Sequence, residues 1–184
     1  MKYIKLLRPK HWVKNAFLFI PLFFAGEIFN TSKLLPLLIA FAAFSLIASS
    51  IYIINDYKDI EADKLHPIKC KRPLASGEIS KPVALILFAL CIIAGFGLAF
   101  CVKEKFVFVL GIYFVLNIFY CFGLKNISIL DIMILSAGFV LRVKAGGVTA
   151  EVALSEWLMI MIFLLSLFMA IAKRRDDILI KMES

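Results

Sequence analysis

The chain has 184 residues, of which 62% are hydrophobic and 18% are charged, and its formal net charge is +8. Soluble globular domains average about 45–50% apolar residues, so this composition excludes an ordinary soluble domain and indicates a membrane protein. The basic excess is attributed to membrane topology, and no nucleic-acid partner is expected. The four cysteines have no CxxC or CxxH spacing, so neither a disulfide framework nor a zinc site is predicted.

Six apolar runs follow one another along the chain, and most approach the roughly 20 residues needed to cross a bilayer. They predict an all-α integral membrane helical bundle of about six transmembrane helices, in a single domain over residues 1–184, with the first run retained as a span. Counted over alternate loops, sixteen basic residues fall on one side and five on the other. The positive-inside rule therefore predicts a cell membrane protein with both termini cytoplasmic. The runs are Ala16–Phe29, Leu34–Ile54, Val83–Val102, Phe106–Leu124, Ile127–Val143 and Ala153–Ala172.

The connection at residues 55–82 joins the second and third runs and is predicted to be a cytoplasmic loop that carries the function. It opens with the sequence N-D-Y-K-D-I-E-A-D. If this segment is helical, Asp56, Asp59 and Asp63 are spaced i, i+3 and i+7, so their carboxylates lie on one face. Oxygen ligands of this kind suit Mg²⁺, and Asn55 adds a neutral oxygen, so these four residues are predicted metal ligands. The alternative is a solvated, salt-bridged helix extension.

Basic residues follow the acidic segment closely. Arg72 is directly before Pro73 in the same loop, and its planar guanidinium can hold two phosphate oxygens at once, which predicts phosphate binding. The alternative for these basic residues is an ordinary positive-inside anchor. The two prolines at 67 and 73 exclude a continuous helix through the loop, and Ser80-Lys81-Pro82 is predicted to begin the third span.

The fifth and sixth runs carry further charges. Asp131 and Arg142 lie near the start and the end of the fifth run, and both are costly in lipid unless they face a protein interior or a polar cavity. A cluster of five charged residues, K-R-R-D-D at Lys173 to Asp177, directly follows the sixth run. The roles of Asp131, Arg142, Asp176 and Asp177 stay open at this point.

Two adjoining motifs resemble a known family. The pattern N-D-x-x-D-x-x-x-D at Asn55–Asp63, followed by K-R-P-L-A-S-G at Lys71–Gly77, resembles the first aspartate-rich motif of the UbiA prenyltransferase superfamily. The resemblance implies an Mg²⁺-dependent site open to the cytoplasm and a lateral groove for a polyprenyl chain. That fold usually has about nine spans, so this chain would represent its N-terminal two thirds. Segments similar to the decaprenyl-phosphate phosphoribosyltransferase-like branch are Leu7–Asn15, Tyr120–Lys125, Gly138–Arg142 and Ala172–Arg175.

For this branch the resemblance implies that a 5-phosphoribosyl group moves from 5-phosphoribosyl diphosphate to a polyprenyl (decaprenyl-type) phosphate. Many relatives carry a second D-x-x-x-D motif after the sixth span, whereas this chain has basic residues there, which favours a donor or acceptor with extra phosphates. Mg²⁺ would neutralise the negative charge that develops on the leaving diphosphate. The predicted catalytic residues are Asp56, Asp59 and Lys125, and the predicted phosphate-binding residues are Lys14, Arg72, Tyr120, Lys173 and Arg174.

Two alternative functions stay open. The first is a prenyltransferase that moves a prenyl group from a prenyl diphosphate to an aromatic or other acceptor. The second is a non-catalytic membrane protein, either an inactive fragment or a lipid-binding protein. Besides membrane lipids, the partners left open are further C-terminal helices or other copies of the chain in a homo-oligomer.

Overall fold

The computed structural model describes residues 2–182, without the side chains of residues 126, 128, 173 and 176–182. All regular elements in this part of the chain are helices, which confirms the all-α prediction. Among the described residues, three helices are long and apolar enough to cross a membrane: α3 (Thr31–Lys58), α5 (Lys81–Phe100) and α6 (Glu104–Cys121). A helix satisfies its backbone hydrogen bonds internally, as the interior of a bilayer requires. The protein is therefore a membrane protein.

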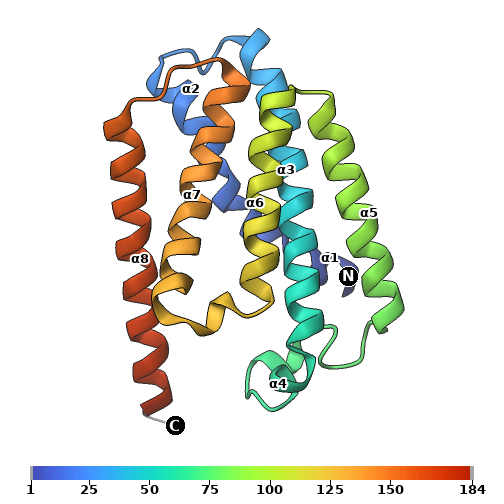
Figure 1. Ribbon diagram of the computed structural model, residues 1–184. Helices are drawn as coiled ribbons and strands as arrows, with labels where there is room; N and C mark the ends of the chain where they lie inside the picture. Colours follow the sequence, from blue (N-terminus) through green and yellow to red (C-terminus); the bar gives the residue numbers. More distant parts are fainter. Residues whose placement is uncertain (1, 183–184) are drawn as a thin grey trace.

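Consecutive long helices run in opposite directions, as short connections between neighbours predict. The bundle is completed by α7 (Ser128–Ala150) and α8 (Glu156–Met182), which pack against each other (Figure 1). We call the lower end of the bundle in Figure 1, where α4 lies, the α4 end; the connections between α5 and α6 and between α7 and α8 lie at the opposite end. The short elements are α1 (Lys2–Leu7), η1 (Pro9–Phe19), α2 (Ile20–Phe24), α4 (Ile60–Lys64), η2 (Lys69–Lys71) and η3 (Leu124–Asn126).

The first apolar run differs from the single α-helical span that its composition predicts. The chain leaves α1 at Arg8, which has a left-handed backbone (φ 52°, ψ 56°), and continues as the 3₁₀ helix η1 and the short helix α2. Pro9 occupies the first position of η1, where its missing N–H group costs no hydrogen bond. This segment still runs from the level of α1 to the level of α2, near the opposite end of the bundle (Figure 1).

The polar residues of η1 explain its tight winding. A 3₁₀ helix has three residues per turn, so Trp12, Asn15 and Leu18 lie on the same face. The Trp12 indole N–H donates to the Ser49 hydroxyl (3.0 Å), and the Asn15 amide donates to the Ser45 hydroxyl (2.9 Å). Ser45 and Ser49 are four residues apart on α3 and so share one face of that helix. These bonds attach η1 to α3 inside the bundle.

Arg142 is buried in the bundle and makes its hydrogen bonds to neutral groups. Its Nε donates to Asn15 Oδ1 (2.9 Å), its Nη1 to the Gly138 carbonyl (2.8 Å) and its Nη2 to the Tyr113 hydroxyl (2.8 Å). Its guanidinium carbon also lies 5.3 Å from the centre of the Phe44 ring, within range of a cation–π interaction. Arg142 therefore satisfies the requirement that an intramembrane charge face the protein interior, and it joins η1, α6 and α7.

We expect the Asn15→Ala variant to lose about 1.5–3 kcal/mol of stability, because a hydrogen bond to the buried Arg142 charge is removed. Thermal unfolding in detergent can be followed with a thiol-reactive dye, as the rise in signal above the initial reaction of the accessible Cys70 and Cys101, because Cys91 and Cys121 are buried in the folded protein. Val13→Ala is the matched control, because Val13 lies two residues away on η1 and its side chain is 70% exposed. An unchanged midpoint for Asn15→Ala would contradict this role of the Asn15–Arg142 bond.

A separate apolar cluster at the α4 end fixes the loop that follows α4. Leu6 of α1, Ile53 of α3 and Ile60 of α4 pack with Leu74 and Ile79 of the loop, and all five residues are at most 5% exposed. The loop is also closed by a hydrogen bond from the Ile79 N–H to the carbonyl of the proline at position 73 (3.0 Å). As predicted, α5 begins at Lys81 with a proline in its first turn. Burial of Leu74 thus holds the preceding basic residues against α3.

Candidate functional site

The acidic segment is not one continuous helix. Helix α3 ends at Lys58 and α4 begins at Ile60, while Asp59 between them has φ −91° and ψ 6°. The break interrupts the continuous helix on which the spacing placed the three aspartates, and their basic partners differ. Asp56 and Asp63 contact one set of basic residues, and Asp59 contacts another, so the break at Asp59 separates the segment into two halves.

The first half pairs two buried carboxylates with two arginines. Arg8 Nη2 lies 2.6 Å from Asp56 Oδ1, and Arg72 Nη1 lies 3.1 Å from the same oxygen and 2.6 Å from Asp63 Oδ2. Asp56 is 2% exposed and Asp63 is 4% exposed, whereas both arginines remain partly exposed. Two buried carboxylates repel each other, and the shared guanidinium of Arg72 offsets that repulsion.

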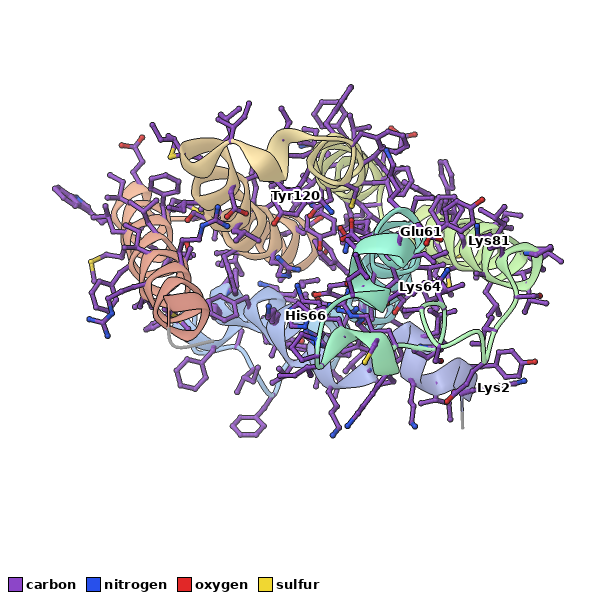
Figure 2. All side chains as sticks on the ribbon, turned by 90° about the horizontal axis from the view of Figure 1, so that it is seen from below. Lys2, Glu61, Lys64, His66, Lys81 and Tyr120 are labelled. Carbon is purple, nitrogen blue, oxygen red and sulfur yellow. The ribbon has the colours of Figure 1, made fainter. Side chains whose placement is uncertain are left out.

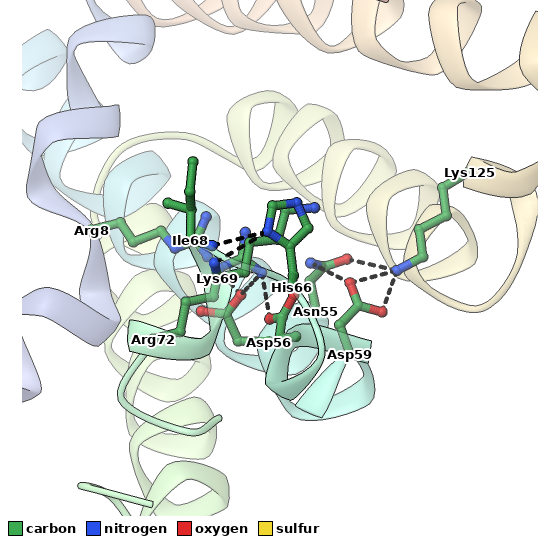
Figure 3. A network of polar contacts seen from close by, with 10 residues as sticks. Arg8, Asn55, Asp56, Asp59, His66, Ile68, Lys69, Arg72 and Lys125 are labelled. Carbon is green, nitrogen blue, oxygen red and sulfur yellow. Dashed lines mark hydrogen bonds and ion pairs between the residues drawn. The ribbon is translucent and has the colours of Figure 1, made fainter. Parts of the chain in front are cut away.

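The second half is centred on Asp59 and Lys125. Lys125 Nζ lies 2.5 Å from Asp59 Oδ1 and 2.7 Å from Oδ2, and it also contacts Asn55 Oδ1 at 3.4 Å. The Asn55 amide in turn donates to Asp59 Oδ2 (3.1 Å). Figure 3 shows Lys125 reaching this pair from the turn at η3, across from Arg8 and Arg72 on the other side of the segment. Asn55 and Lys125 are 70 residues apart in the sequence.

The carboxylates of the acidic segment contact basic side chains at the positions where the sequence predicts Mg²⁺. Among the described residues, no group of three histidine, cysteine or acidic side chains is arranged to hold one metal ion. The cations of Arg8, Arg72 and Lys125 instead balance the three carboxylates one for one. Even so, oxygens of two different aspartates meet at the single nitrogen Arg72 Nη1, and a set of buried oxygen donors has the chemistry that Mg²⁺ requires.

A third acidic centre forms around Asp131, near the start of α7. Its Oδ1 accepts a hydrogen bond from the Tyr120 hydroxyl (2.8 Å), and its Oδ2 pairs with Arg174 Nη1 of α8 (3.0 Å). Asp131 is 6% exposed, so its charge faces protein partners, as its position in an apolar run requires. Tyr120 is the second-last residue of α6, which ends at the α4 end of the bundle (Figure 1). The view from that end shows Tyr120, Glu61 and His66 toward the middle of the bundle (Figure 2).

The remaining predicted residues have separate positions. Lys14 has an exposed side chain on η1, and the side chains of Lys173, Asp176 and Asp177 lie outside the described residues. Arg8 was absent from the residues predicted for the site, although its segment is part of the family resemblance. Its distance of 48 residues from Asp56 gives no local pattern that would pair them.

Comparison with known proteins shows which family the chain matches. Residues 16–182 match the family model of the UbiA prenyltransferase family. The decaprenyl-phosphate phosphoribosyltransferase of Corynebacterium glutamicum is 41% identical, over 96% of this chain and 54% of that protein. The enzyme of the same name from Mycolicibacterium smegmatis is 40% identical, over 95% of this chain and 56% of that protein. The chain thus spans about half the length of these curated relatives.

The fold has solved counterparts as well. A UbiA homologue from Archaeoglobus fulgidus, solved with DMAPP and Mg²⁺, superimposes with a TM-score of 0.76. The match covers 91% of this chain and 60% of the archaeal chain at 21% sequence identity, so it shows a shared fold. With a family match over residues 16–182 and a helical bundle of the same architecture, the chain belongs to the UbiA prenyltransferase family.

Proposed function

We propose that the chain is part of a membrane transferase that moves a 5-phosphoribosyl group from 5-phosphoribosyl diphosphate to a polyprenyl phosphate. The observation that carries the proposal is the balanced network of Arg8, Arg72 and Lys125 around Asp56, Asp59 and Asp63. Such a network offers both an oxygen site for a cation and cationic donors for phosphate oxygens. The names of the relatives, which are decaprenyl-phosphate phosphoribosyltransferases, supply the substrate class.

In this proposal Asn55, Asp56, Asp59 and Asp63 would hold Mg²⁺. The ion would supply charge neutralisation for the diphosphate that leaves. Arg8, Arg72 and Lys125 would then exchange their carboxylate partners for phosphate oxygens. This exchange would need little reorganisation of the protein, because the three cations are already in place. Arg174, held by Asp131, and Tyr120 would contribute from the other side of the site. Lys14 and Lys173 stay predicted phosphate-binding residues on the basis of the sequence.

The chemistry needs positioning more than proton transfer. The polyprenyl phosphate is already anionic at neutral pH, so one of its oxygens attacks C1 of the ribose without first losing a proton. A new bond forms between C1 and that oxygen while the bond from C1 to the diphosphate breaks, and the diphosphate takes both electrons. Residues that hold two phosphorylated substrates in line can lower the barrier by removing translational and rotational freedom before the reaction.

The orientation in the membrane is also a proposal. The α4 end carries most of the basic residues, so the positive-inside rule supports a cytoplasmic location for this end and its site in a cell membrane. Soluble 5-phosphoribosyl diphosphate would then reach the acidic segment from the cytoplasm, while the polyprenyl chain stays in the bilayer. A Cys101→Ser variant removes the exposed thiol at the opposite end and leaves Cys70, in the loop after α4, as the thiol to label. A membrane-impermeant thiol reagent is expected to label Cys70 in inverted vesicles and not in intact cells, and the reverse pattern would contradict this orientation.

The activity test uses membranes that contain the chain. Incubation with 5-phosphoribosyl diphosphate, Mg²⁺ and a polyprenyl phosphate is expected to yield a lipid-linked phosphoribose, detected by mass spectrometry. Chelation of the metal with EDTA is expected to stop the reaction, and added Mg²⁺ is expected to restore it. No product from folded, membrane-inserted protein would contradict the proposed function.

A second candidate is transfer of a prenyl group from a prenyl diphosphate, as in the family name. The same oxygen donors and cations suit a prenyl diphosphate, and a digeranylgeranylglyceryl phosphate synthase of Sulfolobus acidocaldarius is 32% identical over 96% of this chain. Here the bond from the allylic carbon to the diphosphate would ionise before the acceptor attacks. Presenting each donor separately and identifying the lipid product distinguishes the two reactions.

Lys125→Met is expected to lower turnover by about 100-fold, because Asp59 and the donor phosphates lose their shared cation. Lys125→Arg keeps the charge and should retain more activity than the methionine variant. Lys81→Met is the control, since Lys81 is an exposed lysine at the start of α5. Equal initial rates for the Lys125→Met and Lys81→Met variants, measured at equal protein in membranes, would exclude a role for Lys125.

A further inference from the structure

Two adjoining cavities lie between α6 and α7 at the opposite end of the bundle from the acidic segment. Their volumes are about 690 Å³ and 440 Å³, and they share the lining residues Glu104, Lys105, Lys144 and Val148. The larger cavity extends toward the connection after α7 and is lined there by Glu151 and its neighbours. The smaller one continues along the helices, so together they form one groove with a polar and an apolar part.

The apolar part faces outward from the bundle. Its walls include Phe108 and Ile112, which lie four residues apart on α6, and Leu141 and Val148 of α7. Phe108 is 71% exposed and Ile112 is 41% exposed in the bundle, so these side chains are available to the acyl region of a bilayer. We call this surface the α6–α7 groove.

Two lysines mark the boundary between the two parts. Lys105 lies in the first turn of α6, and Lys144 is six residues before the end of α7, about 9 Å along the helix axis. Both are exposed. In the described part of the chain, neither has a carboxylate within 4.0 Å, whereas their neighbour Lys103 pairs with Glu151. A lysine at that depth in a bilayer needs an anionic partner or must extend to the interface.

We propose that the α6–α7 groove binds a membrane lipid with a net negative phosphate headgroup. The headgroup phosphate would lie between Lys105 and Lys144, and an acyl chain would lie along Phe108, Ile112 and Leu141. The charge selects the ligand: Lys103 and Glu151 pair with each other, which leaves Lys105 and Lys144 against the single carboxylate of Glu104. The remaining net positive charge favours a headgroup of net negative charge over a zwitterionic one. The apolar wall that continues from the lysines toward the middle of the bundle favours a lipid over a free phosphate ion, which has no chain to bury.

This site is separate from the proposed substrate site. The acidic segment and its cations lie at the α4 end, and the α6–α7 groove begins at the opposite end (Figure 1). A lipid in the groove would therefore belong to the leaflet at the opposite end and would contact α6 and α7, which carry Tyr113 and Arg142 of the buried hydrogen-bond group. The lipid site is independent of the proposed transferase function, so a result that excludes one of them leaves the other unaffected.

The test uses the full chain in liposomes with a photoactivatable phosphatidylglycerol whose reactive group is on the acyl chain. Mass spectrometry of the cross-linked peptides is expected to find the label within residues 105–112 and 141–148. Unlabelled phosphatidylglycerol should compete for the site, and phosphatidylcholine should not. The K105Q/K144Q variant is expected to lose labelling of these peptides by about tenfold or more, because each basic residue contributes roughly fivefold to binding of anionic lipid.

Two variants separate the site from general effects. K2Q/K81Q removes the same charge at the α4 end and is expected to leave labelling of the groove unchanged, and Phe108→Ala is expected to reduce labelling with the unfolding midpoint preserved. Equal labelling by a phosphatidylcholine probe, or full labelling of K105Q/K144Q, would overturn the proposal. Cross-links between α6 residues of two copies of the chain, in place of lipid adducts, would also overturn it by assigning the groove to a protein contact.

Discussion

Asp56→Asn is expected to abolish phosphoribosyl transfer, with a loss of at least about 100-fold in turnover. Asp56 Oδ1 is the only described carboxylate oxygen that contacts both Arg8 and Arg72. Asparagine keeps the size and one oxygen but removes the charge, so the two arginines lose their common anion and Mg²⁺ loses a proposed ligand. The measurement is the rate of formation of the lipid-linked product in membranes with equal amounts of inserted protein.

Glu61→Gln is the matched control for this variant. Glu61 belongs to the same acidic segment, but its side chain is 77% exposed and pairs with Lys64 on the surface of α4. Exposed pairs of this kind contribute little, so both the activity and the unfolding midpoint should stay near those of the parent protein. Equal activities for Asp56→Asn and Glu61→Gln would remove Asp56 from the proposed site.

Gly146→Ala is expected to have the largest effect on folding. A Cβ atom at this position would lie 1.9 Å from the Leu18 carbonyl oxygen and 2.7 Å from the Leu18 carbonyl carbon. Because the obstructing atoms belong to the backbone of η1, no side-chain rotation relieves the overlap, and the cost reaches about 3 kcal/mol or more. We expect the thermal midpoint in detergent to fall by roughly 5–10 °C.

Gly97→Ala provides the comparison for that experiment. Gly97 lies within α5, and a Cβ atom there would have no neighbour within 4 Å. Alanine is preferred over glycine inside a helix by about 0.5–1 kcal/mol, so the midpoint should stay the same or rise. A midpoint for Gly146→Ala equal to that of Gly97→Ala would show that η1 does not pack closely on α7.

The close contact at Gly146 also connects packing to the site. The segment that packs on α7 through Leu18 is the one that places Arg8, and a displaced η1 would move Arg8 from Asp56. Gly146→Ala protein that survives in the membrane is therefore expected to lose activity in addition to stability. This coupling explains how a position at the far end of α7 affects the acidic segment without touching it.

Much of the fold follows from local patterns. Apolar runs of about 20 residues are required by the thickness of the hydrocarbon layer, and they located α3, α5 and α6 near their observed bounds. The start of α5 was predicted from Ser80-Lys81-Pro82, because proline is tolerated in the first turn of a helix. The 3₁₀ winding of η1 was not predicted, because it depends on hydroxyl partners on α3 that only tertiary contact supplies.

The candidate site was likewise predictable from the sequence only in part. Residue types and spacing in the sequence alone predicted a charged site of Asp56, Asp59, Asp63 and Arg72 at a membrane boundary, because carboxylates at helical spacing suit Mg²⁺ and a guanidinium suits phosphate oxygens. Only the tertiary structure decided how they pair: the break at Asp59 turns one carboxylate toward Lys125 and leaves two for Arg8 and Arg72. Ion pairs form between whichever opposite charges the packed helices bring within a few ångströms, and Arg8 and Lys125 are 48 and 66 residues from their partners along the chain.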